Sequence, residues 1–116
     1  MKTSTNSSQS KSSKSLTFVK NCSREGPGLL ETFANERDIP FQIIDLETGV
    51  SLPDSAQCSA VVILGGPASA NDQSPVILSE LNFARELLDK GIPVLGICLG
   101  LQILAKAGFV FLFTTT

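Results

Sequence analysis

One cysteine in this 116-residue chain lies in a sequence pattern that is typical of a nucleophile. Cys98 is the centre of the segment from Gly96 to Gly100, GICLG, which follows an apolar run and precedes helical spacing. A glycine-framed turn between a strand and a helix is the geometry of the nucleophile elbow, which holds a reactive side chain clear of a sheet. The following helix would direct its positive end at the sulfur and favour the thiolate. We therefore predict that Cys98 is a nucleophile; the alternative is a buried structural cysteine.

Nucleophilic acyl transfer also needs hydrogen-bond donors for the oxyanion that develops on the substrate. The backbone N–H of Leu99 is one candidate, because it begins the predicted helix. Gly65 and Gly66 follow another apolar run, and glycine lets the backbone approach a ligand closely. Pro67 has no N–H, so Gly66 is the predicted donor in this turn. The alternative is that this Gly-Gly-Pro segment only terminates a strand.

Gln102 lies four residues after Cys98, so its side chain should lie one turn further along the same side of the helix. There its amide would bind a polar substrate; the alternative is a solvated helix residue. The remaining acids of interest are interpreted as ordinary exposed carboxylates: Glu25, Glu31, Glu36, Glu80 and Glu86. Cys22 and Cys58 are placed in loops without a glycine frame and are interpreted as structural or incidental.

Strands and helices are expected to alternate along the chain. Strands are predicted at residues 16–19, 41–46, 60–64 and 92–97, helices after Gly28, from Pro75 and over 99–107, and a loop over 47–58. Residues 60–64 are apolar without alternation, which is typical of a strand buried on both faces of a parallel sheet. Ser74 should cap the helix that begins at Pro75, and Gly91 should end it. The buried stripe of that helix is predicted to be Ile77, Leu81, Ala84 and Leu88.

This alternation predicts an α/β fold with a parallel sheet that is covered by helices on both faces. Sites in such sheets lie at the carboxyl ends of the strands. The Gly65–Gly66 turn and the Cys98 turn both follow strands at that edge. They are therefore expected to contribute to one site.

Composition limits the classes of function. A hydrophobic content of 42% with 17% charged residues suits one packed domain, and a net charge of −2 gives no reason to expect nucleic acid or a membrane surface as a partner. Residues 1–15 are rich in Ser and Lys but lack Arg, so we predict a disordered tail rather than a transit peptide. Without an export signal the cytoplasm is the expected compartment, with free thiols. The chain contains no histidine, so it cannot form a Cys–His pair or a His-ligated metal site by itself.

Three segments of the chain resemble class I glutamine amidotransferases. Pro93 to Gln102 resembles the active-site segment of this family, and Val62 to Asp72 resembles its oxyanion loop. Glu25 to Gly28 is similar to the corresponding segment in the branch of the family that resembles the amidotransferase part of GMP synthase. The resemblance covers Leu16 to Gly108. Three ordered motifs at the correct spacing are far more specific than a lone G-x-C-x-G.

The resemblance implies a flavodoxin-like, three-layer α/β domain that hydrolyses glutamine to glutamate and ammonia, without a metal or cofactor. Cys98 matches the nucleophile that forms a glutamyl thioester. Gly66 and Leu99 match the oxyanion donors, and Gln102 and Gly65 match substrate-binding positions. Many domains of this family pass ammonia to a synthetase partner.

The chain departs from the family pattern after residue 108. Family members carry a His and a Glu, two residues apart, far downstream of the cysteine, whereas Phe109 to Thr116 contains neither. We therefore expect a disordered tail at 1–15, a partial amidotransferase domain at 16–108 that is incomplete in its C-terminal half, and a non-family tail at 109–116. The transcript beyond codon 108 would test this truncation.

Two other functional classes stay open beside a catalytically incomplete amidotransferase. One is a non-catalytic glutamine-binding or regulatory module, which the missing histidine favours. The other is a cysteine-based relative among the flavodoxin-like hydrolases and chaperones. Gln102 and the Gly65–Gly66 turn favour the amidotransferase over this last class.

Overall fold

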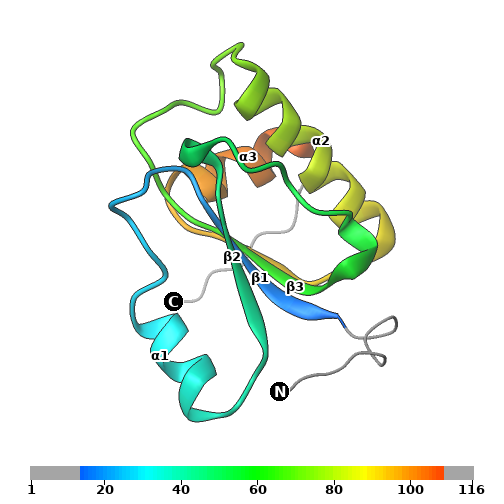
Figure 1. The fold of residues 1–116 in the computed structure, drawn as a ribbon. Coiled ribbons are helices and arrows are strands. Elements are labelled where there is room, and N and C mark those ends of the chain that lie inside the picture. The colour runs from blue at the N-terminus through cyan, green and yellow to red at the C-terminus, as the bar shows by residue number, and fades with distance from the viewer. Residues whose placement is uncertain (1–13, 109–116) are drawn as a thin grey trace, which may run out of the picture.

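A parallel sheet forms the centre of the computed structural model, which describes residues 14–108. Its strands are β1 (Ser15–Lys20), β2 (Phe41–Asp45), β3 (Cys58–Ile63) and β4 (Val94–Gly96). They lie in the order β2-β1-β3-β4, and every neighbouring pair is parallel (Figure 1). The α/β class and the parallel sheet predicted from the sequence are confirmed.

Helices cover both faces of the sheet. Helix α1 (Leu29–Glu36) lies on one face, and α2 (Pro75–Lys90) and α3 (Leu99–Ala107) lie together on the other (Figure 1). Alternate residues of the central strands divide between two apolar clusters. One cluster, on the α2–α3 face, includes Val19, Val61 and Ile63. The other, on the α1 face, consists of Phe18, Val62 and Leu64 with partly buried neighbours. The predicted burial of β3 on both faces is therefore confirmed.

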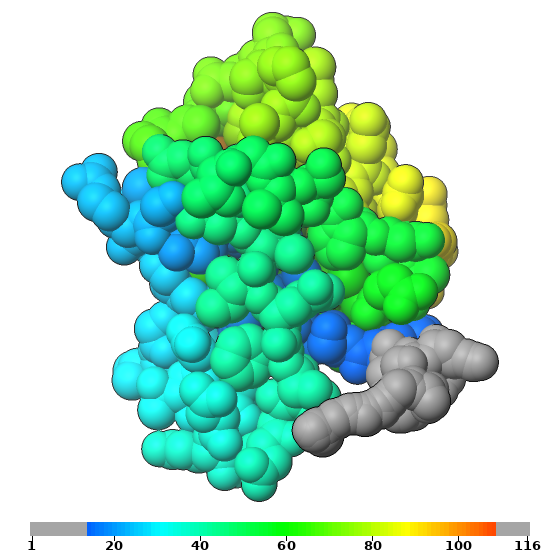
Figure 2. Space-filling view, in the orientation of Figure 1, coloured from blue at the N-terminus to red at the C-terminus, as the bar shows by residue number. Residues whose placement is uncertain are grey.

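The two faces are covered unequally. On the α1 face, Leu29 is 85% exposed and Phe33 is 47% exposed, so two large apolar side chains of this helix are poorly covered. The Phe33 ring lies under the guanidinium of Arg37, 4.6 Å from its centroid. In the space-filling view the cyan surface of α1 lies at one end of the molecule and the yellow-green surface of α2 at the other (Figure 2). The main core therefore lies between the sheet and the α2–α3 pair.

Helix α2 begins and ends as its sequence predicts. The Ser74 hydroxyl accepts a hydrogen bond from the Ile77 N–H at 3.3 Å, Pro75 is the first helical residue, and Gly91 is left-handed with φ 70°. The buried stripe differs at its end, where Leu87 is buried and Leu88 is only half-buried.

The structure differs from the prediction most at β4 and in the predicted loop before β3. Strand β4 is shorter than predicted, because the Ile92 N–H donates to the Leu87 carbonyl at 2.9 Å and so belongs to the end of α2. The predicted loop over 47–58 contains two 3₁₀ helices, η2 (Leu46–Thr48) and η3 (Ser55–Gln57). Asp45 and Asp54 cap them by accepting hydrogen bonds from backbone N–H groups two residues further on.

The predicted loop position of Cys58 is wrong. Cys58 is the buried first residue of β3, and the Thr17 hydroxyl of β1 donates to its sulfur at 3.4 Å. Up to residue 13 the predicted tail lies outside the described residues, as does the segment Phe109 to Thr116; β1 begins at Ser15. Within residues 14–108 we find no helix with the length and apolar character needed to cross a bilayer.

Candidate active site at the ends of β3 and β4

Cys98 occupies a strained turn between β4 and α3. Its backbone has φ 53° and ψ −113°, and it is the residue that precedes the first turn of α3. For a residue with a side chain, such a conformation costs about 1–3 kcal/mol. It persists only where the surrounding structure enforces it. Cys98 is exposed, whereas Cys22 and Cys58 are buried, and all three thiols are free. The alternative of a buried structural cysteine is therefore wrong for Cys98.

The glycines on both sides of Cys98 leave no space for a side chain. A Cβ atom added at Gly96 would lie 2.5 Å from the Gly100 carbonyl carbon. A Cβ atom added at Gly100 would lie 2.0 Å from the Ile63 carbonyl oxygen. Real Cβ atoms do not approach backbone atoms so closely, so α3 can pack against β3 and β4 only with glycine at these positions. The tight, glycine-framed turn between a strand and a helix that the sequence pattern predicted is confirmed.

The turn at Gly65 and Gly66 lies directly beside Cys98. A Cβ atom added at Gly65 would lie 3.2 Å from the Cys98 Cβ, and one added at Gly66 would lie 3.6 Å from the Leu99 Cδ2. Adjacent parallel strands, β3 and β4, end at the same edge and bring these two turns together. The expectation that both turns meet at one edge of the sheet is confirmed.

The first turn of α3 has a backbone donor available. The Gly100 N–H donates to the Ile97 carbonyl and the Leu101 N–H to the Cys98 carbonyl, both at 2.9 Å. Among residues 14–108 no group accepts a hydrogen bond from the Leu99 N–H, as is usual for the first residue of a helix. An anionic ligand atom near Cys98 could use this N–H.

Gln102 is exposed on α3, one turn beyond Cys98. Together with Ala105 and Lys106 it lines a shallow hollow against Ala70 and Asn71. Lys106 on α3 contacts the loop that follows Gly66, because its Nζ donates to the Ala70 carbonyl at 3.3 Å and to the Asn71 Oδ1 at 3.1 Å. Gln102 thus lies beside the loop that follows the glycine turn.

Glu80 was predicted to be an exposed acid, and this prediction is wrong. It is fully buried on α2, at 0% exposure. The Asn21 Nδ2, just after β1, donates to the Glu80 Oε1 at 3.0 Å and to the Leu64 carbonyl at 3.2 Å. Burial raises the pKa of Glu80 from 4.5 to about 7, against the smaller lowering effect of the hydrogen bond from Asn21. Its Oε2 has no hydrogen-bond partner within the described part of the chain.

The sequence did contain a signal for this buried acid. Glu80 is three residues after Ile77 and four before Ala84, and both of these residues are buried. An acid at helical spacing within an apolar stripe must face the core. Asn21 had a weaker signal, since it is the polar residue that directly follows a strand at the edge where the site forms.

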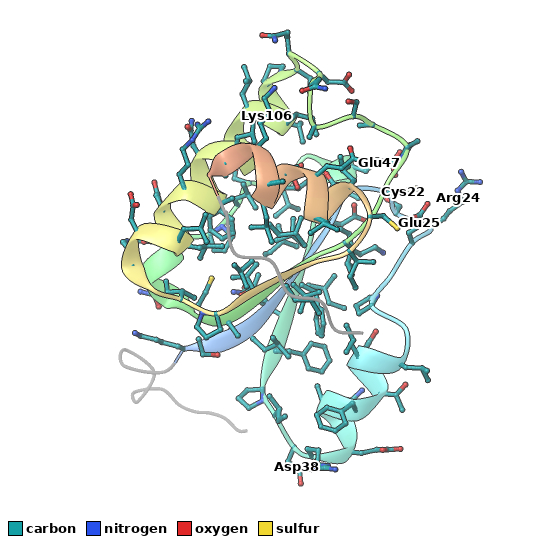
Figure 3. All side chains as sticks on the ribbon, turned by 180° about the vertical axis from the view of Figure 1, so that it is seen from behind. Cys22, Arg24, Glu25, Asp38, Glu47 and Lys106 are labelled. Atoms are coloured by element: carbon teal, nitrogen blue, oxygen red, sulfur yellow. The ribbon has the colours of Figure 1, made fainter. Side chains whose placement is uncertain are left out.

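Glu25 is exposed, as predicted, but it also lies at the site. Its Oε1 would be 3.4 Å from a Cβ atom added at Gly65, the same position that lies beside Cys98. The loop that carries it is fixed by the Glu25 N–H, which donates to the Cys22 carbonyl at 2.9 Å, and by Ser23, whose N–H donates to the Glu47 Oε1 at 2.6 Å. Cys22, Glu25 and Glu47 therefore lie on the same side of the molecule (Figure 3).

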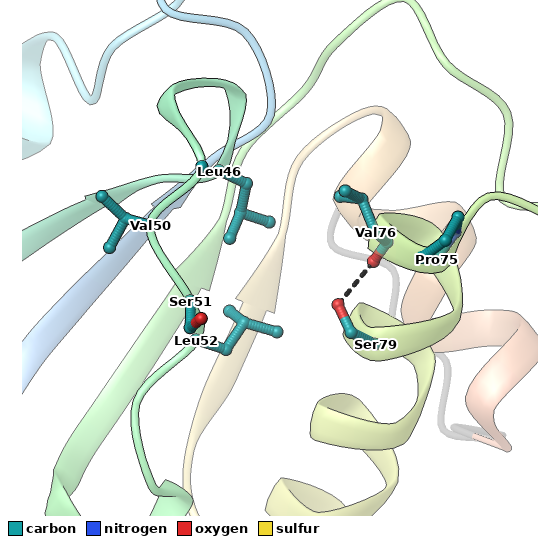
Figure 4. A pocket seen from close by; sticks show the side chains of 8 residues that line it. Leu46, Val50, Ser51, Leu52, Pro75, Val76 and Ser79 are labelled. Carbon is teal, nitrogen blue, oxygen red and sulfur yellow. Dashed lines mark hydrogen bonds between the residues drawn. The ribbon is translucent and has the colours of Figure 1, made fainter.

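A second hollow lies between the segment after β2 and the start of α2 (Figure 4). Its lining is mainly apolar and includes Leu46, Val50, Leu52, Pro75 and Val76. The Ser79 hydroxyl at its wall donates to the Val76 carbonyl at 2.7 Å. Among the described residues, its lining includes the hydroxyls of Ser51 and Ser79 but no cysteine and no titratable side chain.

Solved structures share this fold. A glutamine amido transferase from Methylobacillus flagellatus is 37% identical with a TM-score of 0.77, over 83% of this chain and 39% of that one. A glutamine amidotransferase from Thermotoga maritima is 33% identical with a TM-score of 0.75, over 81% of this chain and 42% of that one. The chain therefore spans about two fifths of the length of these structures.

Curated relatives match over shorter segments. GMP synthase [glutamine-hydrolyzing] from Chlorobium chlorochromatii is 37% identical over 71 residues, which is 61% of this chain and 13% of that protein. The protein of the same name from Oleidesulfovibrio alaskensis is 50% identical over 48 residues, which is 40% of this chain and 8% of that protein.

A model of the family described as glutamine amidotransferase class-I matches residues 29–108, which is more than half of the chain. This match includes both glycine turns, Cys98 and the helix that follows it. The chain belongs to the class I glutamine amidotransferase family.

Proposed function

We propose that this chain carries the nucleophile and oxyanion donors of a glutamine amidotransferase. The Cys98 sulfur attacks the side-chain amide carbon of glutamine, and the carbonyl oxygen becomes an oxyanion that accepts hydrogen bonds from the Gly66 and Leu99 N–H groups. Collapse of this adduct breaks the C–N bond and leaves a glutamyl thioester, while a proton must reach the departing ammonia. Water then hydrolyses the thioester to glutamate and regenerates the thiol.

The observation that carries this proposal is the backbone of Cys98. An exposed thiol in a strained conformation, between two glycines that admit no side chain, is the arrangement of a nucleophile elbow. The fold by itself would leave function open. Gly65 and Gln102 are proposed to contact the substrate, because they lie beside Cys98 and beside the loop after Gly66.

The proton transfers need a general acid–base, and this sequence contains no histidine to serve as one. Loss of a well-placed general acid–base typically lowers a rate by about 10² to 10⁴. We therefore expect this chain alone to release no significant ammonia from glutamine. We propose the cytoplasm as the compartment of this protein. There the ammonia would pass to a synthetase partner, since related proteins are named as glutamine-hydrolysing GMP synthases.

A labelling experiment tests the proposed nucleophile. Mild treatment with iodoacetamide near neutral pH, followed by peptide mapping, should modify Cys98 before Cys22 or Cys58, because only Cys98 is exposed. Preferential labelling of either buried thiol in folded protein would overturn the assignment.

A second assay tests the expected lack of turnover. Ammonia release from glutamine should match that of the Cys98→Ala variant. Turnover that depends on Cys98 would show that another group replaces the histidine.

The absence of histidine also supports a second candidate, a glutamine-binding or regulatory module without turnover. Hydroxylamine separates the two candidates, since it traps a glutamyl thioester as the hydroxamate. A Cys98-dependent hydroxamate would favour the enzyme, whereas glutamine binding without it would favour the module.

A further inference from the structure

We propose that Asn21 and Glu80 are positioning residues, which form a buried hydrogen-bonded pair that orients the Gly65–Gly66 turn toward the Cys98 sulfur. This inference rests on the proposed function, in which the Gly66 N–H acts as an oxyanion donor. It assigns a role to two residues that do not contact the reacting atoms.

Asn21 holds the glycine turn from two sides. The Leu64 N–H donates to the Val19 carbonyl of β1 at 2.9 Å, which is the last backbone hydrogen bond that joins β3 to β1. The Asn21 side chain continues this ladder by donating to the Leu64 carbonyl at 3.2 Å. That carbonyl belongs to the peptide group that leads into Gly65, so the hydrogen bond fixes the plane of this peptide.

Asn21 also limits the path of the next residue. A Cβ atom added at Gly66 would lie 2.9 Å from the Asn21 Cβ, which is closer than Cβ atoms normally approach another atom. The Gly66 backbone therefore packs directly on Asn21. The same side chain bonds the residue before Gly65 and contacts the residue after it.

Glu80 fixes the orientation of the Asn21 amide. An amide that pointed its oxygen at the Leu64 carbonyl would place two acceptors together. The Glu80 Oε1 accepts from the Asn21 Nδ2 at 3.0 Å, so the amide nitrogen is held between two acceptors. The pair thereby connects α2 to the ends of β1 and β3.

A purely stabilising role does not explain an acid at this position. Burial of a carboxyl group is unfavourable unless its oxygens are hydrogen-bonded, and the Glu80 Oε2 is unpartnered among residues 14–108. An apolar residue of similar size would fill the same space in the stripe of α2 at lower free energy. The presence of a carboxyl group at this position is accounted for by the hydrogen bond that orients Asn21.

The test compares two reagents on the full chain. Chloroacetone reacts with the Cys98 thiolate with loss of chloride, and its carbonyl oxygen is polarised by oxyanion donors. Methyl methanethiosulfonate forms a mixed disulfide with loss of methanesulfinate and has no carbonyl group. The ratio of the two rates therefore reports the donors, whereas exposure or activation of the thiol changes both rates alike.

We expect Asn21→Ala to lower this ratio about tenfold, less than the ~10² to 10³ lost when a donor is removed outright. Glu80→Leu, which leaves Asn21 in place and keeps the core apolar, should lower it in the same direction. Glu80→Gln retains an acceptor for Asn21 and should preserve the ratio. An unchanged ratio in Asn21→Ala or Glu80→Leu, with a native circular dichroism spectrum, would overturn the positioning role.

A third reagent separates this proposal from the proposed function. The chloromethyl ketone analogue of glutamine should label Cys98 faster than chloroacetone, and glutamine should protect against it. If that preference is absent while the ratio still falls in Asn21→Ala, glutamine is the wrong substrate and the positioning role stands.

Discussion

The two turns beside the candidate nucleophile lie next to each other, but different parts of the molecule hold them in place. Backbone contacts fix the turn around Cys98, since Gly96 and Gly100 pack on backbone atoms with no space for a Cβ. Side chains from β1 and α2 support the Gly65–Gly66 turn. Substitutions around Cys98 should therefore affect folding, whereas substitutions around the Gly65–Gly66 turn should affect the geometry of the site and leave the fold intact.

The largest effect is expected at Gly100. In Gly100→Ala the new Cβ would lie 2.0 Å from the Ile63 carbonyl oxygen, so α3 must move away from β3. Overpacking typically costs 1–3 kcal/mol, and we expect a loss of about 3 kcal/mol in the free energy of unfolding, measured with urea.

Gly26→Ala is the matched control, because a Cβ there meets nothing within 4 Å. Its free energy of unfolding should change by less than about 0.5 kcal/mol. Equal stabilities of the two variants would show that backbone packing does not fix the Cys98 turn.

An effect of similar size, but stabilising and confined to higher pH, is expected when Glu80 is replaced by glutamine. Its pKa is raised from 4.5 to about 7 in the folded protein, so between these values the folded state binds more protons than the unfolded state. The stabilisation is complete below pH 4.5 and is lost as the pH rises through about 7. Glu80→Gln should abolish this loss and be more stable at pH 8 by about 3 kcal/mol.

Urea denaturation at pH 5 and pH 8 measures this difference. Glu86→Gln, on the same helix but exposed, serves as the control and should retain the wild-type pH dependence. The same pH dependence in wild type and Glu80→Gln would refute the raised pKa.

A smaller effect should report the strain at Cys98 itself. Cys98→Gly should be more stable than Cys98→Ala by about 1 kcal/mol, because glycine adopts a positive φ without a steric penalty. Thermal unfolding of both variants by calorimetry measures the difference. A glycine variant that is less stable than the alanine variant would argue against strain in the turn.

The smallest effect is expected at the sheet edge that β4 forms. The Gly65–Gly66 turn follows a central strand, whereas the Cys98 turn follows β4, which is the last strand at its edge among the described residues. Leu95 is 50% exposed there, and Leu101 on α3 is 55% exposed. We expect the chain to self-associate through this edge and Leu95→Lys to weaken the association in sedimentation velocity. A wild-type monomer across micromolar concentrations would contradict this expectation.

The fold was largely predictable because its signals are local. Apolar runs marked the strands, Ser74 and Pro75 marked the start of α2, and the glycines around Cys98 marked a turn that only glycine fits. Errors occurred where tertiary contacts decide. Cys58 was assigned to a loop, although pairing with β1 draws it into β3.

The two turns of the candidate site could be predicted from the sequence, but the side chains that hold the Gly65–Gly66 turn could not. Cys98, Gly66 and Leu99 were predicted from the sequence because a strand-end motif names them directly. Asn21 and Glu80 are far apart in the sequence, at a separation of 59 residues, and only the packing of α2 on the sheet brings them together. Their roles, like those of Cys98, Gly66 and Leu99, stay predictions until the reagents are compared.

The Cys98 turn also has a consequence for how such a domain can change over evolution. Its shape is imposed through the backbone of residue 98 and its two glycines, and the thiol makes no hydrogen bond within residues 14–108 that would help to hold it. The thiol is thus independent of the architecture that presents it. A lineage could exchange cysteine for serine or alanine here, and so alter or lose an activity through a single amino-acid substitution, while the scaffold remained under separate selection.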